Sequence, residues 1–162
     1  MTLPPATTAK ASDTRSAKAR RARAPSRTEL AVPNRIEEVE RVSDLLDEFG
    51  AKHGLAKDDL TDMQVALDEA FANIVNSAYS DGDPHEIHIC LAVGRGTLRA
   101  VIEDDGMPFD PLAVAAPDLS LPLHERPVGG LGIHFIKSLM SDVKYKRIGD
   151  RNRLTLTKLL SE

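Results

Sequence analysis

Five short runs in which apolar and polar residues alternate constrain the fold most, because four of them occur in two closely spaced pairs. The runs span residues 28–32, 86–93, 97–103, 143–148 and 154–159. Gly94-Arg95-Gly96 separates the first pair, and the turn Gly149-Asp150 lies within the second connection. Short connections that contain glycine join antiparallel strands, so each pair predicts a β-hairpin. The run at 28–32 predicts a separate first strand, which Pro33 ends.

Helical periodicity fills most of the remaining chain. Apolar residues recur at helical spacing over 36–49, which predicts a first helix whose end is marked by Gly50 and Gly54. A second helix is predicted at 57–79 and a third at 133–141. The order is therefore strand, two helices, two strands, a loop, a helix and two strands. This order predicts an α+β fold, a two-layer sandwich with helices on one face of a mostly antiparallel sheet.

The charge of the chain is unevenly distributed. The 162 residues have a formal net charge of −4, but residues 1–27 carry seven Lys and Arg side chains against Asp13 alone. The rest of the chain therefore carries a net charge of −10, which argues against a nucleic-acid-binding domain and against a direct nucleic-acid partner.

Residues 1–27 contain few large apolar residues, so we expect a disordered basic tail followed by one folded domain over 28–162. The tail is either a docking or localisation arm or a solvated segment without a specific partner, and we favour the second.

Cys90 is the only cysteine, so an intrachain disulfide is impossible, as is typical of proteins in a reducing compartment. No apolar run approaches the ~20 residues that span a bilayer, and the N-terminus lacks the apolar core of a secretory signal. We therefore expect a cytoplasmic protein without a membrane partner.

The second predicted helix carries a carboxylate and an amide in an otherwise apolar stretch. Glu69 and Asn73 are four residues apart, so they lie on the same face of that helix. A buried carboxylate needs a partner or a metal, and the oxygens of Asp, Glu and Asn suit Mg²⁺. Taken alone, the same spacing also occurs on ordinary solvated helices.

Two further motifs have the residue types of a nucleotide site. In Asp104-x-Gly106 an acid ends a strand, where it could accept a hydrogen bond from an exocyclic amine such as that of adenine. Gly129-Gly-Leu-Gly132 opens a helix, where free backbone N–H groups and the helix dipole favour phosphate. The proline-rich stretch 112–128 between these motifs has no clean periodicity and is predicted to be a lid.

In this order the three motifs resemble those of the GHKL ATPase superfamily, which includes histidine kinases and type II topoisomerases. Within it, the chain resembles the anti-sigma-factor serine kinases of the RsbW and SpoIIAB type. The resemblance covers about residues 28 to 160 and implies the Bergerat-type ATP-binding fold. The residues that carry it are Glu69-Ala-Phe-Ala-Asn73, Ala78-Tyr79, Asp104-Asp-Gly-Met-Pro-Phe-Asp-Pro111 and Gly129-Gly-Leu-Gly-Ile-His134.

The resemblance implies a role for each matching residue. Glu69 would be the general base for a phosphoryl acceptor, and Asn73 would bind both ATP and Mg²⁺. The other residues that would bind ATP are Asp104, Gly106, Gly130, Leu131 and Gly132. The chain departs from the family at Ser77, where many relatives carry His. It also departs in the last strand, where Asn152-Arg-Leu-Thr155 replaces a common Gly-Thr turn and makes a phosphate role for Thr155 doubtful.

The function implied by the resemblance is that of an ATP-dependent serine/threonine protein kinase and anti-sigma factor. Such a kinase phosphorylates an anti-anti-sigma (STAS) protein, sequesters a sigma factor or another regulator, and commonly forms a homodimer. The helix at 36–49, with its acidic outer face, is a candidate partner surface. The alternative is a nucleotide-gated partner switch without productive kinase activity, although Glu69 argues against it because binding alone needs no base.

Overall fold

The computed structural model describes residues 24–113, 115, 118–125 and 130–162, whose strands form a single five-stranded sheet. The strand order is β1-β2-β3-β5-β4, and every neighbouring pair is antiparallel. The strands are β1 (Ser26–Pro33), β2 (Glu86–Gly94), β3 (Thr97–Asp104), β4 (Asp142–Ile148) and β5 (Arg151–Leu159). The two predicted hairpins are β2–β3 and β4–β5, so the predicted antiparallel pairing is confirmed.

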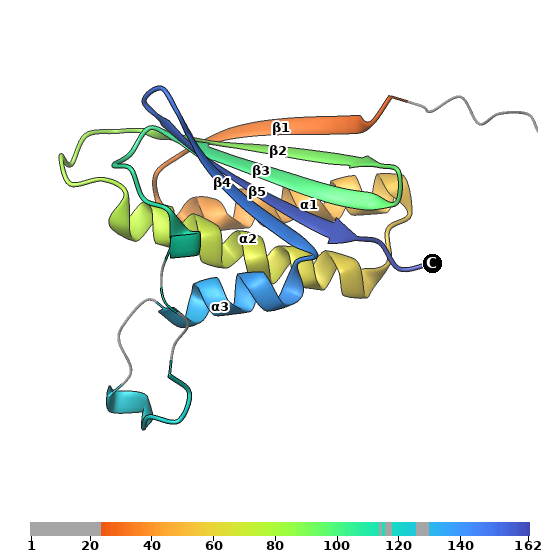
Figure 1. The fold of residues 1–162 in the computed structure, drawn as a ribbon. Coiled ribbons are helices and arrows are strands. Elements are labelled where there is room, and N and C mark those ends of the chain that lie inside the picture. The colour runs from red at the N-terminus through yellow and green to blue at the C-terminus, as the bar shows by residue number, and fades with distance from the viewer. Residues whose placement is uncertain (1–23, 114, 116–117, 126–129) are drawn as a thin grey trace, which may run out of the picture.

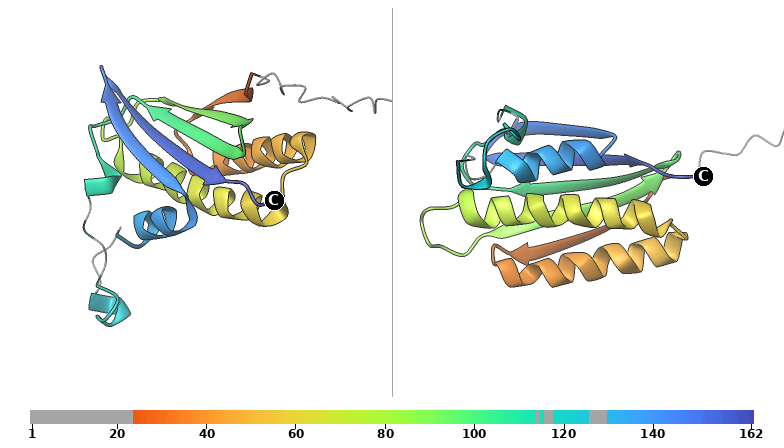
Figure 2. Two further views of the ribbon diagram at one scale, coloured as in Figure 1. Left: turned by 45° about the vertical axis from the view of Figure 1, so that its right-hand side comes forward. Right: turned by 90° about the horizontal axis from the view of Figure 1, so that it is seen from below.

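The helices cover one face of this sheet, as Figures 1 and 2 show. They are α1 (Val39–His53), α2 (Lys57–Ser77) and α3 (Gly130–Leu139). The predicted two-layer α+β sandwich is therefore confirmed. No helix among the described residues has the length and apolar character needed to cross a bilayer.

Several boundaries differ from the sequence-based expectation, and those of β1, β5 and α3 change the assignment of named residues. β1 begins at Ser26, so Ser26 and Arg27 belong to the sheet and not to a disordered tail; the expected disorder of residues 1–23 lies outside the described residues. β5 begins at Arg151, three residues earlier than predicted, because polar Asn152 occupies an inward position where the pattern requires an apolar residue. α3 begins at Gly130, within the predicted glycine loop.

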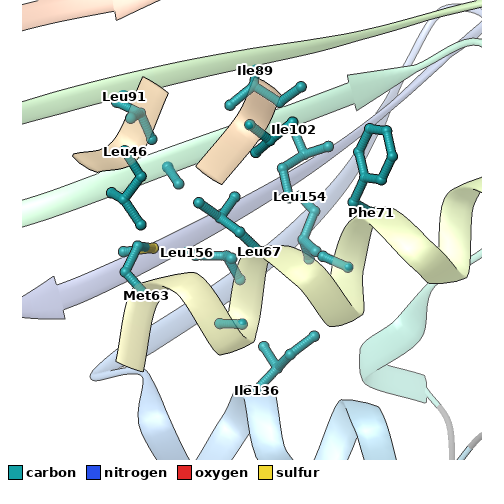
Figure 3. Packing of buried hydrophobic residues seen from close by; sticks show 14 of the residues in the cluster. Leu46, Met63, Leu67, Phe71, Ile89, Leu91, Ile102, Ile136, Leu154 and Leu156 are labelled. Carbon is teal, nitrogen blue, oxygen red and sulfur yellow. The ribbon is translucent and has the colours of Figure 1, made fainter. Parts of the chain in front are cut away.

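The core lies between the sheet and the helices, and residues from both layers fill it. Leu67 and Phe71 of α2 point toward Ile102 and Leu154 of the sheet (Figure 3), and Leu67 and Phe71 are each 1% exposed. Burial of an apolar side chain of this size contributes roughly 1.5–3 kcal/mol. α2 is therefore held by its apolar face, which fixes the positions of the polar residues on its flank.

The first turn of α2 is also attached to the end of the sheet. Asp59 is 2% exposed, and its carboxylate accepts hydrogen bonds from the backbone N–H of Ser161 at 2.8 Å and from its hydroxyl at 3.1 Å. Leu160 donates to the carbonyl of Gly96, so the residues after β5 are also held to the β2–β3 turn. These bonds fix where α2 begins relative to the sheet.

Replacing Asp59 with alanine should destabilise the fold, because both hydrogen bonds from Ser161 to this buried carboxylate are lost. The matched control is Asp58→Ala, since Asp58 lies in the same first turn of α2 but is exposed. Both variants lose the same favourable charge at the helix N-terminus. Asp59→Ala should lower the free energy of unfolding by about 1–3 kcal/mol more than the control, measured by urea denaturation. Equal losses would contradict the structural role of the Asp59–Ser161 bonds.

Candidate functional site

A cavity of about 150 Å³ lies between α2, the segment after β3, α3 and the β4–β5 hairpin. Its walls are mostly apolar, with Ile74, Pro111 and Ile133 among them. A cavity of this size lined by apolar side chains can hold a benzene-sized ring. The polar side chains that line it are Asn73, Ser77, Asp104, Tyr145 and Asn152. The cavity therefore suits a flat ring with a polar edge.

α2 carries Asn73 and Glu69 on the flank that faces this region. Asn73 lines the cavity, one turn away from Ser77. Glu69 does not line the cavity; its carboxylate lies against Gly132 of α3. The two predicted residues therefore lie in different surroundings. The Asn73 amide faces the cavity, and the Glu69 carboxylate lies at the contact between α2 and α3.

Asp104 ends β3 and faces the cavity with only 3% of its surface exposed. Its Oδ1 accepts a hydrogen bond from the backbone N–H of Gly106 at 2.9 Å. A Cβ on Gly106 would lie 2.6 Å from the carbonyl oxygen of Ala78, so only glycine fits at this position. The N–H of Met107 donates to the same Ala78 carbonyl at 2.9 Å. The turn after β3 is therefore packed directly on the end of α2.

The glycines predicted to form a phosphate-binding loop lie inside a helix. Gly130, Leu131 and Gly132 form the first turn of α3, which corrects the expectation that the helix starts at Ile133. First-turn N–H groups have no partner within the helix, so this end of α3 retains the chemistry that favours an anion. A Cβ on Gly132 would overlap the Glu69 carboxylate, which is why glycine fits there.

The predicted lid is described only in part. Short 3₁₀ turns occur at Pro111–Ala113 and Leu123–Glu125. Lys137 of α3 donates to the carbonyl of Leu112 at 3.4 Å, so the start of this segment contacts α3. Its role as a lid remains a prediction.

The sequence analysis missed Asn152 as a site residue. Asn152 is 6% exposed, lines the cavity and donates a hydrogen bond to Asp104 Oδ1 at 2.9 Å. A polar residue at an inward-facing strand position could have indicated Asn152. The predicted strand began at residue 154, however, so Asn152 was not assigned to a strand. Thr155 alternates with the buried Leu154 and Leu156, so it points to the face of the sheet without helices and lies away from the cavity.

A second polar cluster holds the loop after α2 against the segment after β3. The ring of His85 stacks on Tyr79 with 4.2 Å between centroids. Its Nε2 lies 2.8 Å from Asp81 Oδ2, and its Nδ1 lies 3.2 Å from Asp105 Oδ1. The Tyr79 hydroxyl donates to Asp105 at 3.1 Å. Because both ring nitrogens face carboxylates, the geometry favours the doubly protonated imidazolium.

The ionisation of this cluster follows from its hydrogen bonds. The hydrogen bond to Asp81, and then that to Asp105, raise the pKa of His85 above its ordinary value, although burial opposes them. Burial would raise the pKa of Asp105, but hydrogen bonds from His85 and Tyr79 outweigh this and lower it. The charged forms of His85 and Asp105 therefore stabilise each other next to Asp104.

We expect His85 to make stability depend on pH. Its raised pKa means that its stabilising contribution is complete below about pH 6.5 and is lost as the pH rises through the folded-state value. The free energy of unfolding of the wild type should therefore fall more between roughly pH 6 and pH 8.5 than that of His85→Gln. His88→Gln, at a more exposed histidine on β2, is the control and should follow the wild type. Parallel curves for wild type and His85→Gln would contradict this role.

Comparison with known proteins identifies the family of this site. Residues 32–158 match the family described as the histidine kinase-like ATPase domain. The serine-protein kinase RsbW of Bacillus thuringiensis (strain Al Hakam) is 32% identical over 120 residues, which cover 72% of this chain and 74% of the relative. The RsbW proteins of Bacillus cereus (strain 03BB102) and Bacillus anthracis (strain A0248) match with the same identity and coverage.

A solved structure has a similar fold. The crystal structure of the RsbU and RsbW domains of Rv1364c from Mycobacterium tuberculosis matches with a TM-score of 0.59 and 19% identity. The match covers 85% of this chain and 32% of that larger chain. The chain therefore belongs to the histidine kinase-like ATPase domain family and, within it, is related to the RsbW serine-protein kinases.

Proposed function

We propose that this chain is an ATP-dependent serine/threonine protein kinase and anti-sigma factor of a partner-switching system. It would phosphorylate a STAS-domain anti-anti-sigma protein and sequester a sigma factor or another regulator. The observation that carries the proposal is that Asn73, Asp104 and Ile133 of α3 line one cavity, while Glu69 lies against Gly132 in the first turn of the same helix. The relatives named as serine-protein kinases support the same activity.

The cavity has the features that an adenine ring requires. Its apolar walls would contact the faces of the ring, and Asp104 would accept a hydrogen bond from the exocyclic amine. Gly130, Leu131 and Gly132 at the start of α3 would bind the phosphates through their backbone N–H groups, and Asn73 would lie beside them.

Asn73 suits Mg²⁺ through its amide oxygen. The described residues contain no group of three His, Cys, Asp or Glu side chains that could hold a metal. Such a group is not required, because Mg²⁺ at phosphate sites keeps several waters and binds one or two protein groups besides the phosphates. Asn73 would therefore be the protein ligand of a Mg²⁺ that is bound mainly by ATP.

Phosphoryl transfer requires mainly positioning and charge neutralisation. ATP supplies the γ-phosphoryl group, and the electron pair of the broken P–O bond leaves with ADP. Glu69 would accept the proton of the acceptor Ser or Thr hydroxyl as its oxygen bonds to phosphorus. The N–H groups in the first turn of α3, against which Glu69 lies, would neutralise charge on the transferred group.

The partners belong to the same proposal. The helix α1 has an acidic exposed face that includes Glu40, Asp44 and Asp47, and this face would bind a protein partner. The protein would be cytoplasmic and homodimeric, with no direct nucleic-acid or membrane partner.

The decisive experiment is phosphotransfer to a STAS-domain protein encoded beside this chain. Wild-type protein with Mg-ATP should phosphorylate it on Ser or Thr. Glu69→Gln keeps the shape of the side chain but removes the base, so it should slow transfer by roughly 10²–10⁴-fold and leave ATP affinity nearly unchanged.

Two results would contradict the proposal in different ways. ATP binding by the wild type without transfer would favour a nucleotide-gated binding module instead of a kinase. Equal transfer rates for wild type and Glu69→Gln would reject Glu69 as the base.

The contact between Gly132 and Glu69 generates a further prediction. Gly132→Ala should displace the Glu69 carboxylate, because the new methyl group would overlap it. Since this carboxylate is the flexible end of a side chain, the thermal unfolding midpoint should change little. Phosphotransfer at saturating ATP should fall by about tenfold or more, because a misplaced base loses most of its contribution. Ser138→Ala, a similarly small change on an exposed position of α3, should keep wild-type activity. Unchanged transfer by Gly132→Ala would reject this dependence.

A further inference from the structure

Asn152 occupies the same row of the sheet as Asp104 and Arg147. β5 lies between β3 and β4, and the strand register pairs Asn152 with Asp104 on one side and with Arg147 on the other. The side chain faces the helices, as Leu154 and Leu156 do, and is 6% exposed. A buried amide is tolerated only when its donors and acceptors find partners.

All four hydrogen-bonding capacities of this amide are in use. Its Nδ2 donates to Asp104 Oδ1 and to the carbonyl of Met107, both at 2.9 Å. Its Oδ1 accepts from the Tyr145 hydroxyl at 2.7 Å and from Arg147 Nη1 at 3.1 Å. The guanidinium can only donate and the carbonyl can only accept, so these neighbours determine which end of the amide is oxygen. Asn152 therefore has one fixed orientation.

This arrangement fixes the orientation of the Asp104 carboxylate and occupies one of its two oxygens. Asp104 Oδ1 already accepts two hydrogen bonds, from Gly106 N–H and Asn152 Nδ2. Among the described residues, none donates a hydrogen bond to Oδ2. The carboxylate lines the cavity, so it can accept one further donor from a ligand while it is prevented from rotating.

The same network fixes the backbone that follows Asp104. Arg147 Nη1 donates to the carbonyl of Gly106 at 2.8 Å, and Asn152 holds the next carbonyl, that of Met107. Two adjacent carbonyls are thus bound to side chains of β4 and β5, and Met107, which carries the second of them, lines the cavity. Their donors come from residues far from Asp104 in the sequence.

We propose that Asn152 is a positioning residue of the nucleotide site. It holds Asp104 so that one carboxylate oxygen accepts a hydrogen bond from the exocyclic amine of the base. Asn152 thereby makes the site prefer a purine that carries an amine at this position over one that lacks it. This inference rests on the proposed function, because it requires that the cavity binds the base of ATP.

The test compares ATP with purine riboside triphosphate, which lacks only the 6-amino group. Binding of both nucleotides is measured by calorimetry on the full chain, together with the thermal unfolding midpoint. The variants are Asn152→Leu, which is similar in size but apolar, and Asn152→Asp, which replaces the donors with an acceptor. The control is Lys158→Met, which removes another inward-facing polar group of β5 that bonds Asp62 and the carbonyl of Leu139, away from the cavity.

Wild type and Lys158→Met should prefer ATP by about tenfold or more, as expected for a hydrogen bond to a charged group. Both Asn152 variants should lose ATP affinity by a similar factor and bind purine riboside triphosphate almost as the wild type does, so that the preference disappears.

If Asn152 had a purely structural role, its variants would bind both nucleotides more weakly by the same factor. The ratio of the two affinities would then stay at the wild-type value, and this result would overturn the inference. ATP binding by the wild type with an unchanged ratio in the Asn152 variants overturns the role of Asn152 alone. Failure of the wild type to bind either nucleotide overturns the proposed function as well, so the two failures are distinguishable.

Discussion

The buried carboxylate of Asp104 is the group on which the geometry of the candidate site depends. A charged side chain that is 3% exposed persists only where donors satisfy it, and here these are the N–H of Gly106 and the amide of Asn152. Those two donors require a turn immediately after β3 and a polar residue on β5. This turn requires glycine at position 106, because Gly106 packs on Ala78 at the end of α2. The contacts of the Asp104 carboxylate thus connect the end of β3, the end of α2 and the wall of the cavity.

The second contact that organises the site is that between α2 and α3. Gly132 lies against the Glu69 carboxylate, so the proposed base and the proposed phosphate-binding turn lie at one helix–helix contact. Asn73, one turn further along α2, lines the cavity instead. A single helix carries both side chains, and its buried face, with Leu67 and Phe71, holds it on the sheet. The cluster around His85 attaches the loop after α2 to Asp105.

Most elements of the fold could be predicted from the sequence, because alternation and helical periodicity are local properties. Prediction failed where a residue serves the tertiary structure instead of the local pattern. Asn152 interrupts the apolar alternation of β5, because its amide forms hydrogen bonds with residues of β3 and β4. Gly130 and Gly132 indicated a loop by their intrinsic flexibility, yet they lie in the first turn of α3, where Gly132 leaves room for the Glu69 carboxylate.

The amino-acid sequence predicted the antiparallel α+β fold and the residue types of the candidate site, including Glu69, Asn73, Asp104 and the glycines of α3. It could do so because each motif is contiguous and its chemistry depends on residue type and short-range spacing. The fold sets which groups meet: Asn73 and Asp104 share one cavity, Glu69 lies outside it against α3, and Asn152 donates a hydrogen bond to Asp104. These contacts join residues that are distant in sequence, and their geometry is set by strand register and helix packing.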